Sequence, residues 1–228
     1  MSALISPKRP HMAPEPGPKV GKSERTRAEI VDAAFEFLWS RPFREMTVNS
    51  LMASTTVSRS AFYQYFRDVH ELMETLLVTL EGEILAGAEP WLLGTGDPVA
   101  LLDESLNELV RVCYRRGPFL KAVADAATAD KQVETAWNGF LGRFDDAVSE
   151  RIAADQNLGL IVDFEPRPVA IALNRLDAYT LIQAFGQRPR SRPGPVAQAI
   201  KRLWISSLYG QQWAASPGST LNRELPTD

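Results

Sequence analysis

The sequence predicts an all-α protein of about nine helices. Apolar residues recur with the 3.6-residue period of an amphipathic helix along most of the 228 residues. The alternation of apolar and polar residues that is typical of a half-buried strand is not convincing anywhere in the chain. Proline and glycine clusters, such as Gly117-Pro118 and QRPRSRPGP (187 to 195), interrupt the pattern at intervals suited to helix ends.

The composition is that of an ordinary globular protein, with 45% hydrophobic and 23% charged residues. No run of 18 apolar residues occurs, and the N-terminus lacks the apolar stretch of a signal peptide. We therefore expect a cytoplasmic protein with no membrane partner. Cys113 is the single cysteine, which excludes an intramolecular disulfide, and His11 and His70 lie far from other metal-binding side chains. We expect neither a metal nor a cofactor.

The first 23 residues predict a flexible basic arm, because five prolines exclude a sustained helix and Lys8, Arg9, Lys19 and Lys22 add positive charge. The pattern changes at Ser23, which we expect to cap a first helix that ends near Ser40. One face of this helix carries the apolar residues Ile30, Ala33, Ala34, Phe37 and Leu38.

Two short helices are predicted next, with Thr47 and Ser58 as their N-caps. On a helix over residues 58 to 66, one side is apolar and the other polar. The side that faces the core carries Ala61, Phe62 and Phe66, and the side that faces solvent carries Arg59, Ser60, Tyr63 and Gln64. Exposed tyrosines beside an available core are unusual, so the polar side needs a function.

Two short helices joined by a four-residue turn (54 to 57) are typical of a helix-turn-helix, which predicts a DNA-binding domain over residues 24 to 67. Arginine can bind guanine and glutamine can bind adenine in the major groove, and tyrosine hydroxyls reach phosphates. Residues 1 to 67 hold ten Lys and Arg against six Asp and Glu, whereas the rest holds fifteen against twenty-two. Positive charge therefore concentrates where DNA would bind.

A larger domain is predicted over residues 68 to 213, for ligand binding and dimerisation, followed by a disordered tail from 214 to 228. Asp68 caps a long helix toward Gly87, and WLLGTGDP (91 to 98) is expected to be a loop. Further helices are expected near 98 to 116, 118 to 128, 130 to 156, 166 to 186 and 194 to 213.

Residues 28 to 43 (AEIVDAAFEFLWSRPF) and 46 to 77 (MTVNSLMASTTVSRSAFYQYFRDVHELMETLL) resemble the N-terminal domain of TetR-type bacterial transcriptional regulators. The resemblance implies that phosphates are contacted by Thr47, Ser58, Tyr63 and Tyr65, and that bases are faced by Arg59, Ser60 and Gln64.

The sequence departs from this family at two positions. Thr56 stands where the family has a turn glycine, so the turn is either strained or differently shaped. Val69 replaces a lysine that binds phosphate, which leaves Arg67 and His70 as substitutes.

The larger domain combines large aromatic residues from several helices with polar residues inside an otherwise apolar helix. The polar residues are Asn174, Asp177 and Thr180, and the aromatics are Tyr114, Phe119, Trp137, Phe140, Phe144, Tyr179, Phe185 and Trp204. A few polar groups in an apolar concavity predict a ligand site. A dimer interface with hydrogen bonds would have the same composition, so both interpretations stay open.

LNRLDAYTLIQAFG (173 to 186) and RLWISSLYG (202 to 210) resemble the last two helices of the TetR-type subgroup that controls ethionamide activation. The resemblance implies a homodimer formed by these helices and a tunnel for apolar ligands, lined by Trp137, Phe144, Asn174, Asp177 and Trp204. Phe140 and Thr180 complete the candidate set. Asp177 replaces an amide of the subgroup, and a buried carboxylate needs a partner. Either Asp177 pairs with Arg175 or another cation, or the ligand differs.

We expect a repressor that binds a palindromic operator as a homodimer and is released by a small apolar or amphipathic molecule. One alternative is a helical-domain enzyme that uses Asp177, although no Ser/His/Asp or Cys/His set can be assembled. Another is an interaction protein that keeps the helix-turn-helix as a scaffold. His70 and the loop 187 to 195 are predicted to be solvated, and Cys113 to be core or pocket wall.

Overall fold

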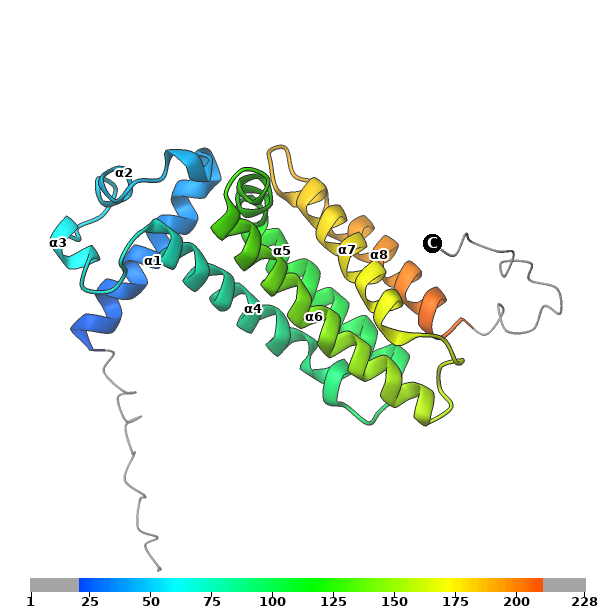
Figure 1. Ribbon diagram of the computed structural model, residues 1–228. Coiled ribbons are helices and arrows are strands. Elements are labelled where there is room, and N and C mark those ends of the chain that lie inside the picture. The colour runs from blue at the N-terminus through cyan, green and yellow to red at the C-terminus, as the bar shows by residue number, and fades with distance from the viewer. Residues whose placement is uncertain (1–20, 211–228) are drawn as a thin grey trace, which may run out of the picture.

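The computed structural model describes residues 21 to 210, and this part of the chain is entirely helical (Figure 1). The predicted all-α class is confirmed, with eight α-helices and one 3-10 turn among the described residues. They are α1 (Lys22–Ser40), η1 (Phe43–Glu45), α2 (Val48–Met52), α3 (Arg59–Phe62), α4 (Val69–Leu93), α5 (Pro98–Ala127), α6 (Lys131–Asn157), α7 (Pro166–Phe185) and α8 (Pro193–Leu208). The predicted tail and all but the last few residues of the basic arm lie outside this range.

The helices α1, α2 and α3 form a small module at one end of the molecule (Figure 1). Its core contains the fully buried Ile30, Ala34, Leu51 and Phe62. Burial of these side chains holds α2 and α3, which are too short to be stable alone, against α1.

Three of the four predicted helix starts are confirmed by capping hydrogen bonds. The side chain of Thr47 accepts from the Ser50 N–H at 3.0 Å, and that of Ser58 from the Ala61 N–H at 3.2 Å. The Asp68 carboxylate accepts from two N–H groups of α4, both at 2.9 Å. The predicted cap at Ser23 is wrong, because α1 already begins at Lys22.

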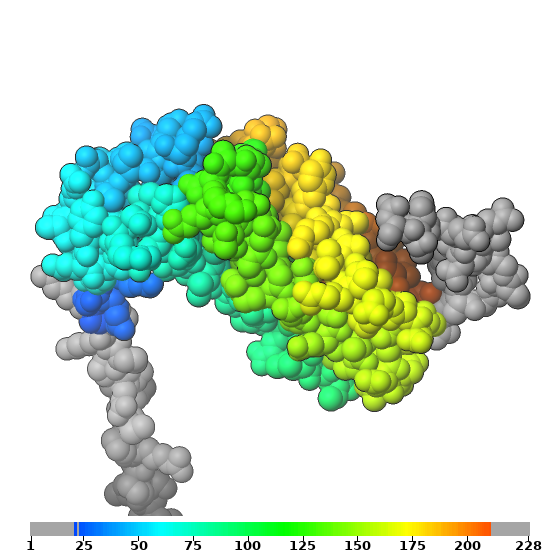
Figure 2. Space-filling model, in the orientation of Figure 1, coloured from blue at the N-terminus to red at the C-terminus, as the bar shows by residue number. Residues whose placement is uncertain are grey.

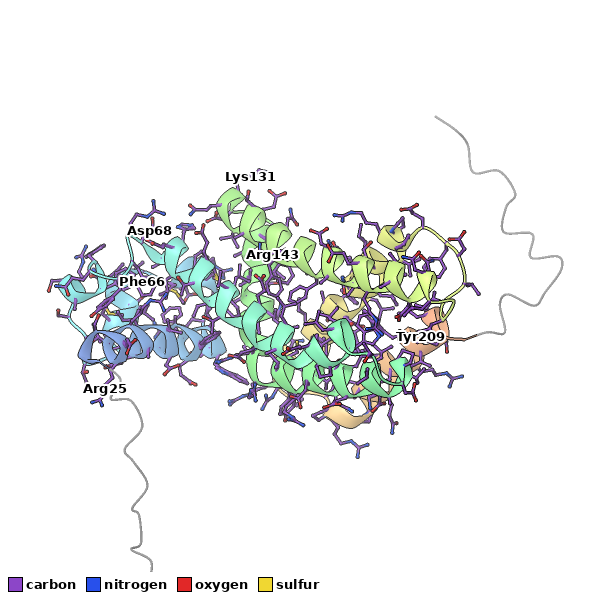
Figure 3. The ribbon with its side chains drawn as sticks, turned by 90° about the horizontal axis from the view of Figure 1, so that it is seen from below. Arg25, Phe66, Asp68, Lys131, Arg143 and Tyr209 are labelled. Atoms are coloured by element: carbon purple, nitrogen blue, oxygen red, sulfur yellow. The ribbon has the colours of Figure 1, made fainter. Side chains whose placement is uncertain are left out.

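The long helices α4 to α8 form the body of the molecule. In Figure 1, α4 leads away from the small module, α5 returns toward it, and α6, α7 and α8 run alongside in alternating directions. Figure 3 shows α4 and α6 side by side, where Arg143 of α6 forms an ion pair with Glu81 of α4 at 2.6 Å. In residues 21 to 210 no helix is long and apolar enough to cross a membrane.

Two predicted helix ends are wrong, and both involve glycine. α5 continues through Gly117-Pro118, where a Cβ on Gly117 would lie 2.4 Å from the backbone oxygen of Phe185. α4 continues past Gly87, where a Cβ would lie 2.8 Å from the Cβ of Glu108. Both glycines therefore permit close helix packing instead of ending a helix. The predicted loop from 91 loses its first three residues to α4, including the buried Trp91.

The third helix is shorter than predicted. α3 ends at Phe62, and residues 63 to 65 form a turn in which the Tyr65 N–H donates to the Phe62 carbonyl at 2.9 Å. Phe66 is nevertheless buried, as the helical spacing predicts, because the turn keeps it on the side of Phe62.

Candidate DNA-binding surface and ligand cavity

The segment from Ser58 to Arg67 presents polar side chains at the outer end of the small module. Ser58, Arg59, Ser60, Gln64 and Arg67 are exposed, and Tyr63 is 49% exposed. Figure 2 shows this segment, in cyan, at the end of the molecule that lies away from α8. The predicted division into a buried and an exposed side is confirmed, whereas contact with DNA stays a prediction.

Short-range interactions hold these side chains in place. The Ser58 and Ser60 hydroxyls lie 3.0 Å apart, and Arg59 Nη2 donates to the Tyr63 hydroxyl at 3.5 Å. The Arg59 guanidinium also lies 5.8 Å from the centre of the Tyr63 ring. Among residues 21 to 210 the recorded contacts of the Arg59 guanidinium are with Tyr63, so its positive charge is available to an outside acceptor.

Two of the candidate side chains are less available for contact with DNA. Tyr65 is partly buried against the core. Arg67 pairs with Glu71, whose Oε2 accepts from the Arg67 backbone N–H at 2.7 Å and from Nε at 3.1 Å. These bonds lower the pKa of the Glu71 carboxyl. Arg67 must leave this pair before it can bind phosphate.

The turn before α3 is held by a residue that the sequence analysis missed. Glu29 of α1 accepts from the Thr56 N–H at 2.9 Å and from the Thr56 hydroxyl at 2.7 Å. The hydroxyl bond lowers the pKa of the Glu29 carboxyl. Among residues 21 to 210 a positive φ angle is recorded at Gly159 and not at Thr56. The turn at Thr56 therefore has a different shape from one that needs glycine, and its backbone is not strained. No pattern in the sequence links positions 27 residues apart.

His70, in the first turn of α4, contacts both η1 and the start of α6, and the prediction that His70 is solvated is wrong. His70 Nε2 lies 2.7 Å from Asp130 Oδ2, and the His70 ring packs edge-on against Phe43. The bond to His70 lowers the pKa of Asp130. In Figure 3 the start of α4 at Asp68 lies beside the start of α6 at Lys131. Because His70 is engaged here, it is not free to replace the family's lysine.

A second contact is made by the loop between α7 and α8, which is largely exposed, as the sequence predicts, but also packs against α1. The guanidinium groups of Arg188 and Arg190 lie 5.2 and 4.9 Å from the ring of Trp39 in α1. Arg190 also donates to the Tyr114 carbonyl at 2.6 Å. Cation–π contacts of this kind connect the last helices of the body directly to the small module.

The candidate ligand residues gather around a small cavity between α4, α5, α6 and α7. Five of the seven predicted residues line it, namely Trp137, Phe140, Phe144, Asn174 and Asp177, together with Ile84, Leu109, Cys113, Leu120, Leu141, Ala178 and Leu181. Its volume is about 60 Å³, whereas pockets for drug-sized ligands measure roughly 300 to 1,000 Å³. In this conformation the cavity admits only a few atoms.

The other two predicted residues do not line the cavity. Thr180 is partly buried elsewhere on α7. Trp204 of α8 is buried and donates its Nε1–H to Asp177 Oδ2 at 3.0 Å. Trp204 thus holds a cavity residue in place without reaching the cavity itself.

The ion pair between Arg175 and Asp177, one of the alternatives left open by the sequence, does not form. Arg175 instead donates from both Nη atoms to Asp145, at 3.1 and 2.9 Å, and Asn174 Nδ2 donates to Asp145 at 2.9 Å. Asp177 keeps a single partner, Trp204, and its Oδ1 is buried with no hydrogen bond. Burial raises the pKa of Asp177 to about 7, against the opposing effect of the Trp204 N–H.

Cys113, predicted as core or pocket wall, is buried and lines the cavity. Burial raises the pKa of its thiol well above the usual range. The thiol therefore stays protonated and is a poor nucleophile.

Two family models match the chain. Residues 30 to 76 match bacterial regulatory proteins of the tetR family, and residues 102 to 210 match the C-terminal domain of the transcriptional regulator EthR. The chain is 22% identical over 186 residues to the HTH-type transcriptional regulator EthR of Mycolicibacterium smegmatis, covering 80% of this chain and 86% of that protein. It is 25% identical over 190 residues to EthR of Mycobacterium tuberculosis, with the same coverage.

Solved structures share the fold. A putative TetR-family regulator from Syntrophomonas wolfei has a TM-score of 0.72 at 14% identity, covering 81% of this chain and 95% of that one. Another from Rhodococcus sp. has a TM-score of 0.69 at 16% identity, covering 80% and 98%.

Proposed function

Because the chain is a TetR-type transcriptional regulator of the EthR subgroup, we propose that it represses transcription by binding a palindromic operator as a homodimer, and that a small ligand releases it. The relatives are DNA-binding regulators, so the chain is not a helical-domain enzyme. We place the regulator in the cytoplasm, where the operator is.

The exposed polar side of the segment from Ser58 to Arg67 carries this proposal. Arg59, Ser60 and Gln64 face bases in the major groove, where arginine and glutamine can each bind one base edge with two hydrogen bonds. Thr47, Ser58, Tyr63 and Tyr65 contact phosphates, which fix the orientation of the module without reading sequence. Arg67 adds a phosphate contact once it leaves Glu71.

The outer faces of α7 and α8 support a homodimer. They expose large apolar side chains, with Ile171 36%, Tyr179 69% and Leu203 45% exposed. Figure 1 places both helices on the side of the body away from α3. Pairing these faces by a two-fold axis leaves both recognition segments free, and they must lie about 34 to 36 Å apart to meet successive major grooves.

The cavity supports release by a ligand. Ile84 of α4 forms part of its wall, and α4 begins at the edge of the small module. A ligand larger than about 60 Å³ must push these helices apart, and it changes DNA affinity only if it binds the released form better. A shift of α4 changes the separation of the two recognition segments.

Selection of bound sites from random DNA with the purified protein tests the proposal. We expect a palindrome, bound with an affinity that falls steeply as salt rises. Leu203→Glu should abolish both dimerisation in sedimentation and operator binding, because one half-site makes too few contacts. Leu158→Glu is the matched control, since Leu158 is 73% exposed in the turn after α6. Recovery of no enriched sequence would instead favour an interaction protein that keeps the module as a scaffold.

A further inference from the structure

Asp177 is an unsatisfied polar group inside the ligand cavity. Asp177 is only 5% exposed, and the Trp204 Nε1–H donates a hydrogen bond to Oδ2 alone. Oδ1 is buried with no hydrogen-bond partner. A buried oxygen without a donor is costly, so such atoms in native proteins require an explanation.

No group on the surrounding helices supplies the missing donor. The residues that line the cavity include no Lys, Arg or His, and Cys113 is the one other titratable side chain among them. The nearest arginine in sequence, Arg175, is committed to Asp145. Apart from Cys113 and Asn174, the side chains that share the cavity wall with Asp177 are apolar: Ile84 from α4, Leu109 and Leu120 from α5, Trp137, Phe140, Leu141 and Phe144 from α6, and Ala178 and Leu181 from α7.

Asn174 adds a second acceptor to the cavity wall. Its amide nitrogen donates to Asp145 at 2.9 Å, which assigns the nitrogen end to that bond. The carbonyl oxygen is then the end of the amide that is not engaged inside the protein. Asp177 Oδ1 and the Asn174 carbonyl oxygen therefore both offer the cavity a hydrogen-bond acceptor.

We propose that the cavity selects an apolar molecule that carries a hydrogen-bond-donating nitrogen, above all a protonated amine, which bonds to Asp177 Oδ1. The proposal rests on the proposed ligand site and specifies its ligand class. One wall of the cavity is aromatic and consists of Trp137, Phe140 and Phe144. The ring centres of Trp137 and Phe140 lie 5.4 Å apart, and those of Phe140 and Phe144 lie 5.0 Å apart. Aromatic faces attract cations, so the wall suits an ammonium group as well as an apolar body.

For the same geometric reason, ligands without a donor should bind more weakly than the amine. A hydrocarbon of equal shape leaves Oδ1 unpaired, and a carboxylate places a second negative charge beside Asp177. Sites built to hydrogen-bond a ligand group discriminate strongly against analogues that lack it. Trp137 and Phe144 are only partly buried, so they can turn aside to admit a ring without unfolding the core.

Benzylamine, benzyl alcohol and toluene test the proposal, because they share a ring and differ in the one group that would meet Asp177. Binding to the full-length wild type is measured by calorimetry at neutral pH, together with the melting temperature and operator affinity. We expect benzylamine to bind at least about tenfold more tightly than toluene, the factor given by one hydrogen bond to a charged group. Benzyl alcohol should lie between the two.

Asp177→Asn keeps the shape of the side chain and removes its charge. Benzylamine should lose about tenfold in affinity for this variant, while toluene changes less than about threefold. Asp146→Asn makes the same exchange at an exposed position of α6 and should change neither.

Two outcomes separate this proposal from the proposed function. If toluene stabilises the wild type and weakens operator binding while benzylamine binds no better, the ligand site stands and the preference for a donor is wrong. If none of the three probes raises the melting temperature or changes operator binding, both the preference and the cavity as an effector site are contradicted.

Discussion

The recognition segment and the ligand cavity hold their polar side chains in opposite ways. In the segment from Ser58 to Arg67 the partners are two to four residues apart, as in Ser58 with Ser60 and Arg67 with Glu71. At the cavity they are 27 to 30 residues apart, as in Asp177 with Trp204 and Arg175 with Asp145. The first group is exposed, whereas Asp145 and Asp177 are buried.

Because of this difference, mutations in the two regions should change different properties, namely DNA binding and folding stability. Exposed side chains contribute little to folding, so changes in the recognition segment should affect DNA binding with small effects on stability. Buried polar groups are sensitive to charge and pH, so changes at the cavity should affect stability strongly. The following predictions test this contrast, starting with the largest effect.

Asp177→Asn should make the protein more stable at pH 8. The folded-state pKa of Asp177 is about 7, above the ordinary 3.8, so folding favours the protonated carboxyl. The wild type therefore loses stability as the pH rises from about 4 to 7, by on the order of 4 kcal/mol, and the loss is complete above that range. Urea unfolding at one protein concentration measures the difference between the variants.

The gain from Asp177→Asn should shrink toward zero below about pH 3, where the wild-type carboxyl is protonated in both the folded and the unfolded state. Unfolding free energies of the two proteins that stay parallel from pH 4 to 8 would show that Asp177 titrates normally.

Gly117→Ala should destabilise the body by about 2 to 3 kcal/mol, because the new methyl group overlaps the backbone of Phe185 and α5 must shift. Gly142→Ala is the control, since a Cβ at Gly142 in α6 meets nothing within 4 Å. The control should be more stable than the wild type by about 0.5 to 1 kcal/mol, as expected for alanine within a helix. Equal effects of the two changes in thermal unfolding would contradict close packing at Gly117.

Arg59→Ala should cost about 1 to 3 kcal/mol of operator affinity and relax the preference at one position of each half-site. Tyr63→Phe should weaken binding to all sequences about equally, because a phosphate contact reads no base. Binding to a panel of operator variants distinguishes the two. A uniform loss for Arg59→Ala would remove its assignment as a base reader.

Ser58→Ala should lower the stability of the small module by about 1 kcal/mol, the usual effect of losing an N-cap. Ser60→Ala removes a hydroxyl whose one recorded partner is the Ser58 hydroxyl, so it should cost less. The melting temperatures of the two variants provide the comparison, and a Ser60→Ala effect as large as that of Ser58→Ala would contradict the cap.

The sequence by itself determined the features that depend on neighbours within one helical turn. The all-α class, the caps at Thr47, Ser58 and Asp68, and the outward direction of Arg59 and Gln64 all follow from 3.6-residue periodicity and local hydrogen bonds. The sequence could group the candidate DNA contacts for the same reason, since seven of the eight lie within the ten positions from Ser58 to Arg67.

Only the tertiary structure decided what depends on residues distant in the chain. Gly87 and Gly117 have the sequence signature of helix ends, but each lies within a helix because a neighbouring helix approaches too closely for a side chain. From the sequence, Arg175 could pair with Asp145 or with Asp177. The packing of α6 against α7 brings it to Asp145, with which it forms the ion pair. Asp177 is thereby left with one buried, unpartnered oxygen at the small cavity, because side-chain pairing across helices depends on their packing and not on local sequence.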